Sequence, residues 1–157
     1  MKEISLETKV KVFSFGELPE AYRILAEKAL SATEDAYAPY SAFHVGAAVL
    51  LENGEVVTGS NQENAAYPSG LCAERVALFS ANTQYPESKV LAIAIAAMTG
   101  GKQVGMIAPC GGCRQVMQEI ENRFHHPMTV LLYGAEKVYV IDNAASLLPI
   151  SFELSTC

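Results

Sequence analysis

The chain has 157 residues, half of them apolar, with a formal net charge of −6 and a pI near 5.0. This length predicts one domain with a sizeable core. Nucleic-acid binding is disfavoured because phosphate recognition needs clustered cations, and only 11 Lys and Arg residues are spread along the sequence. No uninterrupted apolar stretch reaches the length that spans a bilayer, so we also expect no membrane partner.

In chain order, residues 17–32 carry apolar side chains at helical spacing and predict a first helix. Residues 43–51 are β-prone and apolar, and the turn signal at 52–55 leads into residues 56–59, which predicts an antiparallel hairpin. Further along, the patterns predict a helix over 71–81, a buried strand over 90–97, a helix over 111–123 and a strand over 128–133. Residues 137–141 fit a short fifth strand and residues 147–149 a short helical segment. Together these elements predict a mixed sheet flanked by helices.

The start of the chain, Met1–Lys9, has neither the apolar run nor the cleavage site of a secretory signal, so we expect a cytoplasmic protein. The sequence contains four cysteines, and two of them form a Cys-x-x-Cys pair. In a reducing compartment such a pair favours metal binding or redox chemistry over disulfides. Cys157 at the chain end stands outside any motif and is expected to be an unligated thiol.

Two short motifs indicate a catalytic metal site. Cys72 is followed two residues later by Glu74, and the segment Pro109–Cys113 supplies Cys110 and Cys113. Structural zinc is usually enclosed by four protein ligands, whereas three ligands and an open position are typical of catalytic zinc. We therefore predict one zinc ion held by the three cysteines, with water in the open position and Glu74 as the adjacent proton carrier.

Both ligand groups are expected where helices begin. The free N–H groups and partial positive charge of a helix N-terminus lower the pKa of a thiol, which favours the thiolate that zinc requires. Three thiolates and Zn²⁺ sum to a charge of −1, which weakens the metal as a Lewis acid. Arg75 lies three residues after Cys72 on the same helical face, and we hypothesise that it donates N–H groups to the sulfurs and offsets this charge.

The motifs occur in one order that resembles the small homotetrameric cytidine deaminases. The resemblance extends from Glu17 to Phe152 and rests on five segments: Pro39–Ala48, Gly59–Tyr67, Cys72–Arg75, Pro109–Gln115, and Leu147–Pro149 with Phe152. It implies zinc-dependent hydrolytic deamination of cytidine and deoxycytidine in pyrimidine salvage. It also implies one zinc per subunit, a homotetramer, and a three-layer α/β/α sandwich with a five-stranded mixed sheet. Residues 1–16 would then be an N-terminal extension, and residues 17–157 a single catalytic domain.

The resemblance also implies roles for residues that would bind a nucleoside. Asn61 and Glu63 would hydrogen-bond the ribose 3′-hydroxyl, Phe43 would form an aromatic wall, and the backbone amide of Ala73 would contact the pyrimidine edge. Tyr67 and Phe152 resemble residues that reach a neighbouring subunit's site, where Phe152 would stack on the base. From the residues alone, Asn61 and Glu63 also fit a polar turn after a strand, and Phe152 equally fits a core position.

Four alternatives share parts of this pattern. The first is deamination of another small aminopyrimidine nucleoside, such as a blasticidin-type antibiotic, although that substrate would not need the pair formed by Asn61 and Glu63. A nucleic-acid deaminase is disfavoured by the acidic composition. A nonenzymatic zinc-stabilised binding module would need a fourth protein ligand. A dithiol redox protein would use Cys110 and Cys113 without a metal.

Overall fold

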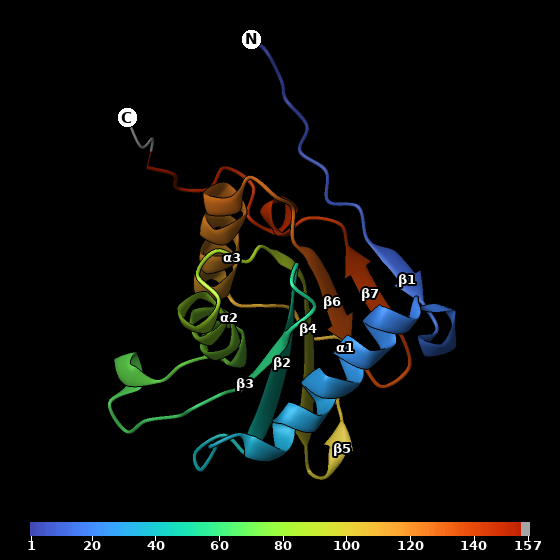
Figure 1. Ribbon diagram of the computed structural model, residues 1–157, viewed down its shortest axis with the longest axis vertical. Helices are drawn as coiled ribbons and strands as arrows, with labels where there is room; N and C mark the ends of the chain where they lie inside the picture. The colour runs from blue at the N-terminus through green and yellow to red at the C-terminus, as the bar shows by residue number, and fades with distance from the viewer. Residues whose placement is uncertain (155–157) are drawn as a thin grey trace.

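The computed structural model describes residues 1–154, which form one mixed sheet with helices on both faces (Figure 1). The helices are α1 (Glu20–Ser31), α2 (Ala73–Gln84) and α3 (Gly111–Phe124). The strands are β1 (Lys11–Phe13), β2 (Phe43–Leu51), β3 (Val56–Ser60), β4 (Val90–Thr99), β5 (Lys102–Gln103), β6 (Thr129–Tyr133) and β7 (Val138–Ile141). The predicted helices and five predicted strands are confirmed within a few residues, and the predicted C-terminal helical segment lies slightly earlier, at Ala144–Leu147. Cys157 lies outside the described residues.

The sheet has seven strands, so the expected number of five is wrong. Its order is β1-β7-β6-β4-β2-β3, and β5 pairs with β4 outside this path. The two additional strands, β1 and β5, are three and two residues long and lack a recognisable periodic pattern. Strands β4 and β6 are parallel and the other pairs are antiparallel, which confirms the mixed sheet.

Alternation along β4 determines which helix covers each face. Ala92, Ala94 and Ala96 pack in the cluster that contains α1, whereas Ile93 and Ile95 pack in the cluster that contains α2 and α3. This arrangement follows from the twofold side-chain period of a strand. It confirms the expected three-layer sandwich, in which α1 covers one face of the sheet and α2 and α3 cover the other face (Figure 1).

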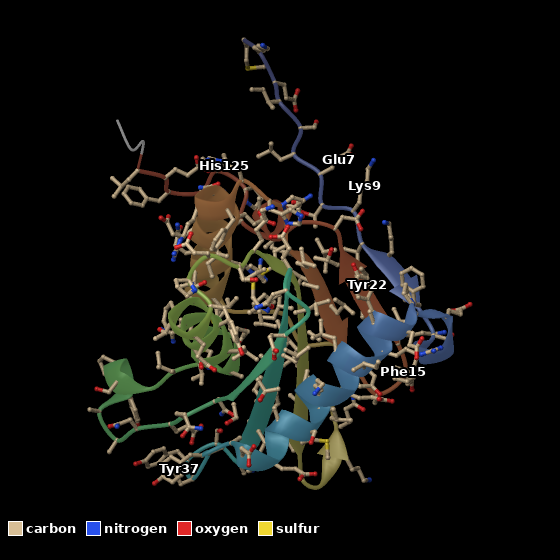
Figure 2. The ribbon with its side chains drawn as sticks, in the orientation of Figure 1. Glu7, Lys9, Phe15, Tyr22, Tyr37 and His125 are labelled. Carbon is tan, nitrogen blue, oxygen red and sulfur yellow. The ribbon has the colours of Figure 1, made fainter. Side chains whose placement is uncertain are left out.

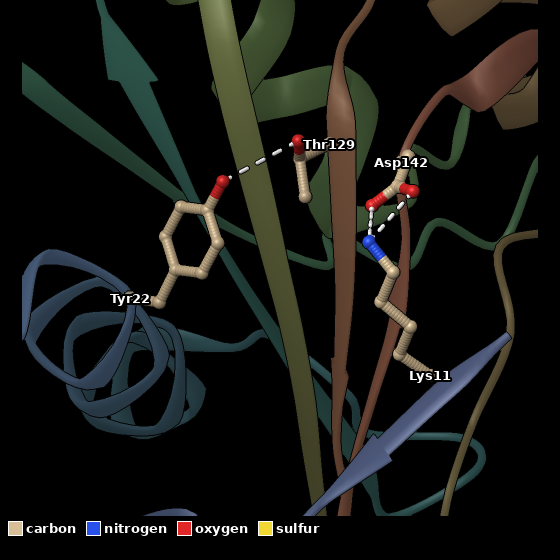
Figure 3. A network of polar contacts seen from close by, with 4 residues as sticks. All are labelled: Lys11, Tyr22, Thr129 and Asp142. Carbon is tan, nitrogen blue, oxygen red and sulfur yellow. Dashed lines mark hydrogen bonds and ion pairs between the residues drawn. The ribbon is translucent and has the colours of Figure 1, made fainter. Parts of the chain in front are cut away.

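The N-terminal segment is joined to the sheet edge. Strand β1 pairs with β7, and Lys11 Nζ lies 2.8 Å from the Asp142 carboxylate (Figure 3). Residues 1–10 are exposed, with Glu7 and Lys9 on this arm (Figures 1 and 2). Thr8 Oγ1 donates to Ser146 O at 2.6 Å, and the residues before it extend away from the sheet. Two strands further into the sheet, the Tyr22 hydroxyl of α1 donates to Thr129 Oγ1 of β6 at 3.4 Å (Figure 3). In residues 1–154, no helix is both long enough and apolar enough to cross a membrane.

Candidate metal centre and active site

Three cysteine thiols converge at the N-termini of α2 and α3. Cys72 is the N-cap of α2, Cys110 is the N-cap of α3, and Cys113 lies in the first turn of α3. The Sγ atoms of Cys72 and Cys110 are 3.7 Å apart, and those of Cys110 and Cys113 are 3.4 Å apart. The prediction that both ligand groups lie where helices begin is therefore confirmed.

The donor set fits a zinc ion. A tetrahedral zinc with Zn–S bonds of about 2.3 Å holds its sulfurs roughly 3.8 Å apart, close to the spacing of these thiols. All three sulfurs lie within 4.8 Å of one another, and within residues 1–154 no fourth His, Cys, Asp or Glu atom joins the group. Soft sulfur donors with one position left for a non-protein ligand match a catalytic zinc rather than a structural one.

Arg75 contacts one of the three sulfurs. Its Nη2 donates to Cys72 Sγ at 3.7 Å, the contact that the charge-offset hypothesis requires. Hydrogen bonding from Cys113, with a further hydrogen bond from Arg75, lowers the pKa of the Cys72 thiol to about 5. Cys72 is thus poised as a thiolate, the form that binds a metal.

Glu74 lies beside the thiols in the first turn of α2. Only 4% of its surface is exposed, although a charged side chain is almost never buried without a partner. Burial raises the pKa of its carboxyl group, and the neighbouring Cys72 raises it further. A buried carboxyl group with a raised pKa next to a metal site is suited to accept and donate protons.

Cys72, Cys110 and Glu74 line a cavity of about 510 Å³, a volume typical of small-molecule sites, whereas Cys113 is buried behind it. The cavity wall includes four residues predicted to bind substrate: Phe43, Asn61, Glu63 and Tyr67. Asn61 is fixed to β2, because its Oδ1 accepts from Val45 N at 2.8 Å and its Nδ2 donates to Phe43 O at 2.9 Å. The carboxylate of Glu63 accepts hydrogen bonds from Tyr40 N, Ser41 N and the Ser41 hydroxyl.

The remaining predicted residues are placed differently. Ala73, whose backbone amide is predicted to contact the base, is fully buried between Cys72 and Glu74 and is not among the residues that line the cavity. Tyr67 is 83% exposed at the cavity rim, and Phe152 is 69% exposed and outside the cavity lining. The carbonyl oxygen of Phe152 accepts a hydrogen bond from Gln115 Nε2 at 2.9 Å. Phe152 is therefore not a core residue of the single chain.

Tyr40 and Ile107 also line the cavity, but sequence reasoning assigned them no role. Ser41 was likewise missed, although it stands in a segment that carried the resemblance. Its position in that segment was visible, but its contact with Glu63 was not, because the two residues are 22 positions apart.

Comparison with known proteins gives consistent matches. Residues 19–125 match the family described as the cytidine and deoxycytidylate deaminase zinc-binding region. The cytidine deaminase of Halalkalibacterium halodurans is 47% identical over 98 residues, which cover 62% of this chain and 70% of that protein. The cytidine deaminase of Sporosarcina psychrophila is 41% identical over 130 residues, covering 83% of this chain and 89% of that protein.

A solved structure extends the match to the fold. The crystal structure of cytidine deaminase from Burkholderia pseudomallei superposes with a TM-score of 0.71 at 42% identity, covering 83% of this chain and 98% of that chain. The family description names a zinc-binding region, in agreement with the three-thiol donor set. Sequence, fold and donor set together show that this chain belongs to the zinc-dependent cytidine deaminase family.

Proposed function

We propose that the protein catalyses the zinc-dependent hydrolytic deamination of cytidine and deoxycytidine to uridine and deoxyuridine, in pyrimidine salvage. The observation that carries this proposal is the convergence of three thiols beside a single cavity that Cys72, Cys110 and the buried carboxyl group of Glu74 line. Family membership, with curated cytidine deaminases at up to 47% identity, supports the same reaction.

Cys72, Cys110 and Cys113 would hold the zinc ion. Zinc, when bound, supplies the Lewis acidity that activates water as a nucleophile near neutral pH. Hydrolysis adds water across the bond between C4 and N3 of the pyrimidine and then releases ammonia. One proton must therefore reach ring atom N3, and another must reach the departing amino group. Glu74 would carry both protons, since its buried carboxyl group with a raised pKa can hold a proton and then release it.

The cavity wall would position the nucleoside. Phe43 would pack beside the base, and the backbone amide of Ala73 would contact the pyrimidine edge. Asn61 and Glu63 would take the ribose 3′-hydroxyl, because both line the cavity and one offers an amide N–H while the other offers a carboxylate oxygen. These groups also argue against a blasticidin-type substrate, which would not need a ribose pair.

We further propose a cytoplasmic homotetramer that acts on small nucleosides, with no nucleic-acid or membrane partner. The net charge of −6 supports a small, weakly charged substrate over a polyanion. The exposed aromatic rings of Tyr67 and Phe152 support contact with neighbouring subunits. In this proposal residues 17–157 form the single catalytic domain and residues 1–16 an extension of it.

Incubation of the purified protein with cytidine tests the function directly. We expect the ultraviolet spectrum to shift from that of cytidine to that of uridine, with one zinc per chain measured in the same sample. Chelation of the metal should abolish the shift, and added zinc should restore it. A Cys113→Ser variant serves as the matched metal-site control and should bind less zinc.

Parallel incubations with blasticidin S and with single-stranded DNA separate the alternatives. Turnover of either substrate in preference to cytidine would contradict the proposal. A zinc-loaded protein that deaminates none of the three substrates would instead support the nonenzymatic binding module.

A further inference from the structure

Residues 37–42, here called the strap, run alongside the segment that carries Asn61 and Glu63. Tyr37 N donates to Asn61 O at 3.0 Å, and Glu63 N donates to Tyr37 O at 2.8 Å. Tyr37 lies at the opposite end of the molecule from His125 (Figure 2). The side chains of the strap follow no regular spacing. Its path beside Glu63 is held by the two backbone hydrogen bonds of Tyr37.

The far end of the strap is held independently. Ala42 has a φ of 53°, in the left-handed region that residues other than glycine seldom adopt. Its N–H donates to Ala38 O at 3.0 Å, and its carbonyl oxygen accepts from Thr99 Oγ1 at 3.2 Å. This conformation persists because both backbone groups of Ala42 are bonded. Ser41 is consequently held between two anchored points.

Ser41 lies in a chain of hydrogen bonds that ends on Glu63. Phe43 N donates to Ser41 Oγ at 3.0 Å, which leaves the hydroxyl proton free to donate to Glu63 Oε1. Glu63 Oε2 accepts from Tyr40 N at 2.9 Å and from Ser41 N at 3.3 Å. The same hydrogen bonds, chiefly that from the Ser41 hydroxyl, lower the pKa of Glu63 and keep it ionised.

A carboxylate offers about four acceptor positions, and three on Glu63 are filled by the strap. One position on Oε1 is left over in a side chain that lines the cavity. Asn61 likewise has one hydrogen-bonding group left over. One N–H of its Nδ2 donates to Phe43 O, and the other N–H has no partner within residues 1–154. A single hydroxyl group can satisfy both by donating to Glu63 and accepting from Asn61.

We propose that Ser41 is a positioning residue that, with the strap, orients Glu63 so that its one remaining acceptor position receives the substrate's sugar hydroxyl. The identification of this group as the 3′-hydroxyl of a nucleoside rests on the proposed function. Ser41 itself does not contact the substrate. The simpler reading, in which Ser41 only stabilises the turn of the strap, predicts a different pattern of kinetic effects.

The test compares zinc-quantified wild type with Ser41→Ala, using cytidine and 3′-deoxycytidine as substrates. For cytidine we expect kcat/KM to fall about tenfold, mainly through a higher KM, as when one hydrogen bond to a charged group is lost. For 3′-deoxycytidine, which lacks the hydroxyl, the wild type should already be a poor catalyst, and the substitution should change kcat/KM by less than about twofold.

Two further variants control for structural effects. Ser41→Thr keeps a hydroxyl on the same carbon and should recover most of the loss with cytidine. Ser31→Ala is a matched control, because Ser31 is exposed at the end of α1 and makes no side-chain cap hydrogen bond. Its kinetics on both substrates should equal those of the wild type, and thermal unfolding should show all variants folded.

Equal losses on cytidine and 3′-deoxycytidine in Ser41→Ala would overturn the inference, because they would indicate a general disturbance of the strap. A wild type that does not distinguish the two substrates would also overturn it. Failure of the wild type to deaminate cytidine at all would be a different result, since it would reject the proposed function itself.

Discussion

Cys72 and Glu74 are two positions apart, a spacing that normally places side chains on different sides of a helix. The conflict is resolved at the N-cap. Cys72 has extended backbone angles, φ −71° and ψ 152°, and stands just before the helix, whereas Glu74 is inside its first turn. A ligand and a proton carrier can therefore face one metal because the helix begins between them.

Glu74→Gln tests the proton-carrier role. The amide keeps the shape of the side chain but cannot accept and release a proton, so we expect kcat to fall by about 10²–10⁴-fold while zinc content and thermal unfolding stay as in the wild type. Steady-state kinetics with cytidine and metal analysis measure both effects. Glu119→Gln on the exposed face of α3 is the matched control and should retain wild-type kinetics. Near-native turnover in zinc-replete Glu74→Gln would reject the assignment.

The two candidate ligand groups could be recognised from sequence because ligand type, the spacing within each motif and the helix starts are local properties. Their convergence across 38 positions followed instead from the number of ligands that a zinc ion requires. The roles of Asn61, Glu63 and Phe43 came from resemblance, and the cavity brings these three together without showing what they bind. Ser41 escaped prediction for a physical reason. Its function depends on an irregular loop folding against a strand end, and no periodic pattern encodes that contact.

At the scale of elements, two glycines set how closely helices approach the sheet. A Cβ at Gly46 of β2 would overlap the carbonyl oxygen of Ala29 in α1. A Cβ at Gly59 of β3 would lie 2.5 Å from Ala77 N and 2.8 Å from Ala73 O in α2. Since α2 carries Cys72 and Glu74 at its N-terminus, the contact at Gly59 determines where the candidate metal site forms.

Gly59→Ala should therefore disturb both stability and metal binding. The added methyl group meets backbone atoms, which cannot rotate away, so we expect the free energy of unfolding to fall by about 3 kcal/mol. We also expect less zinc per chain, measured after urea unfolding curves establish the folded fraction. Gly16→Ala is the control, because nothing lies within 4 Å of its added Cβ. Equal free energies of unfolding for the two variants would show that α2 can shift to accommodate the added methyl group without loss of stability.

The long elements were predicted because their burial follows a simple period, as in the alternating Ile and Ala residues of β4. Strands β1 and β5 were missed because segments of three and two residues are too short to show a period. Lys11 pairs with Val140 and Phe13 with Val138, contacts more than 120 positions apart in the chain. A three-residue segment carries no signal of such a distant partner.

Deletion of residues 1–14 tests what β1 contributes. It removes the pairing with β7, the ion pair of Lys11 and Asp142, and the packing of Phe13. The exposed edge of β7 would then present unpaired backbone groups, so we expect a lower Tm and concentration-dependent light scattering. Deletion of residues 1–7 is the matched control, because it leaves β1 and the Thr8 hydrogen bond to Ser146 intact. Identical behaviour of both truncations would mean that β1 adds nothing to stability.

At the scale of the whole molecule, two aromatic rings that are proposed to act in substrate sites are exposed on the single chain. Cys72, Cys110 and Glu74 line the cavity, whereas Tyr67 at its rim is 83% exposed and Phe152, outside its lining, is 69% exposed. Exposed aromatic rings are typical of surfaces that contact a partner. We therefore expect neighbouring copies of the chain to cover these rings. For the proposed homotetramer, solution mass measurements should give four times the 16.9 kDa of one chain.

Subunit mixing tests whether Phe152 acts in a neighbouring site. Phe152→Ala chains would lack the stacking ring and Glu74→Gln chains would lack the proton carrier, so each homo-oligomer should have low activity. Hybrids purified through two different tags would contain sites with Glu74 from one chain and Phe152 from another. We expect their activity on cytidine to exceed the mean of the two parents, because only shared sites can combine intact groups. Activity equal to that mean would place Phe152 and Glu74 in the same chain's site or remove Phe152 from the site altogether.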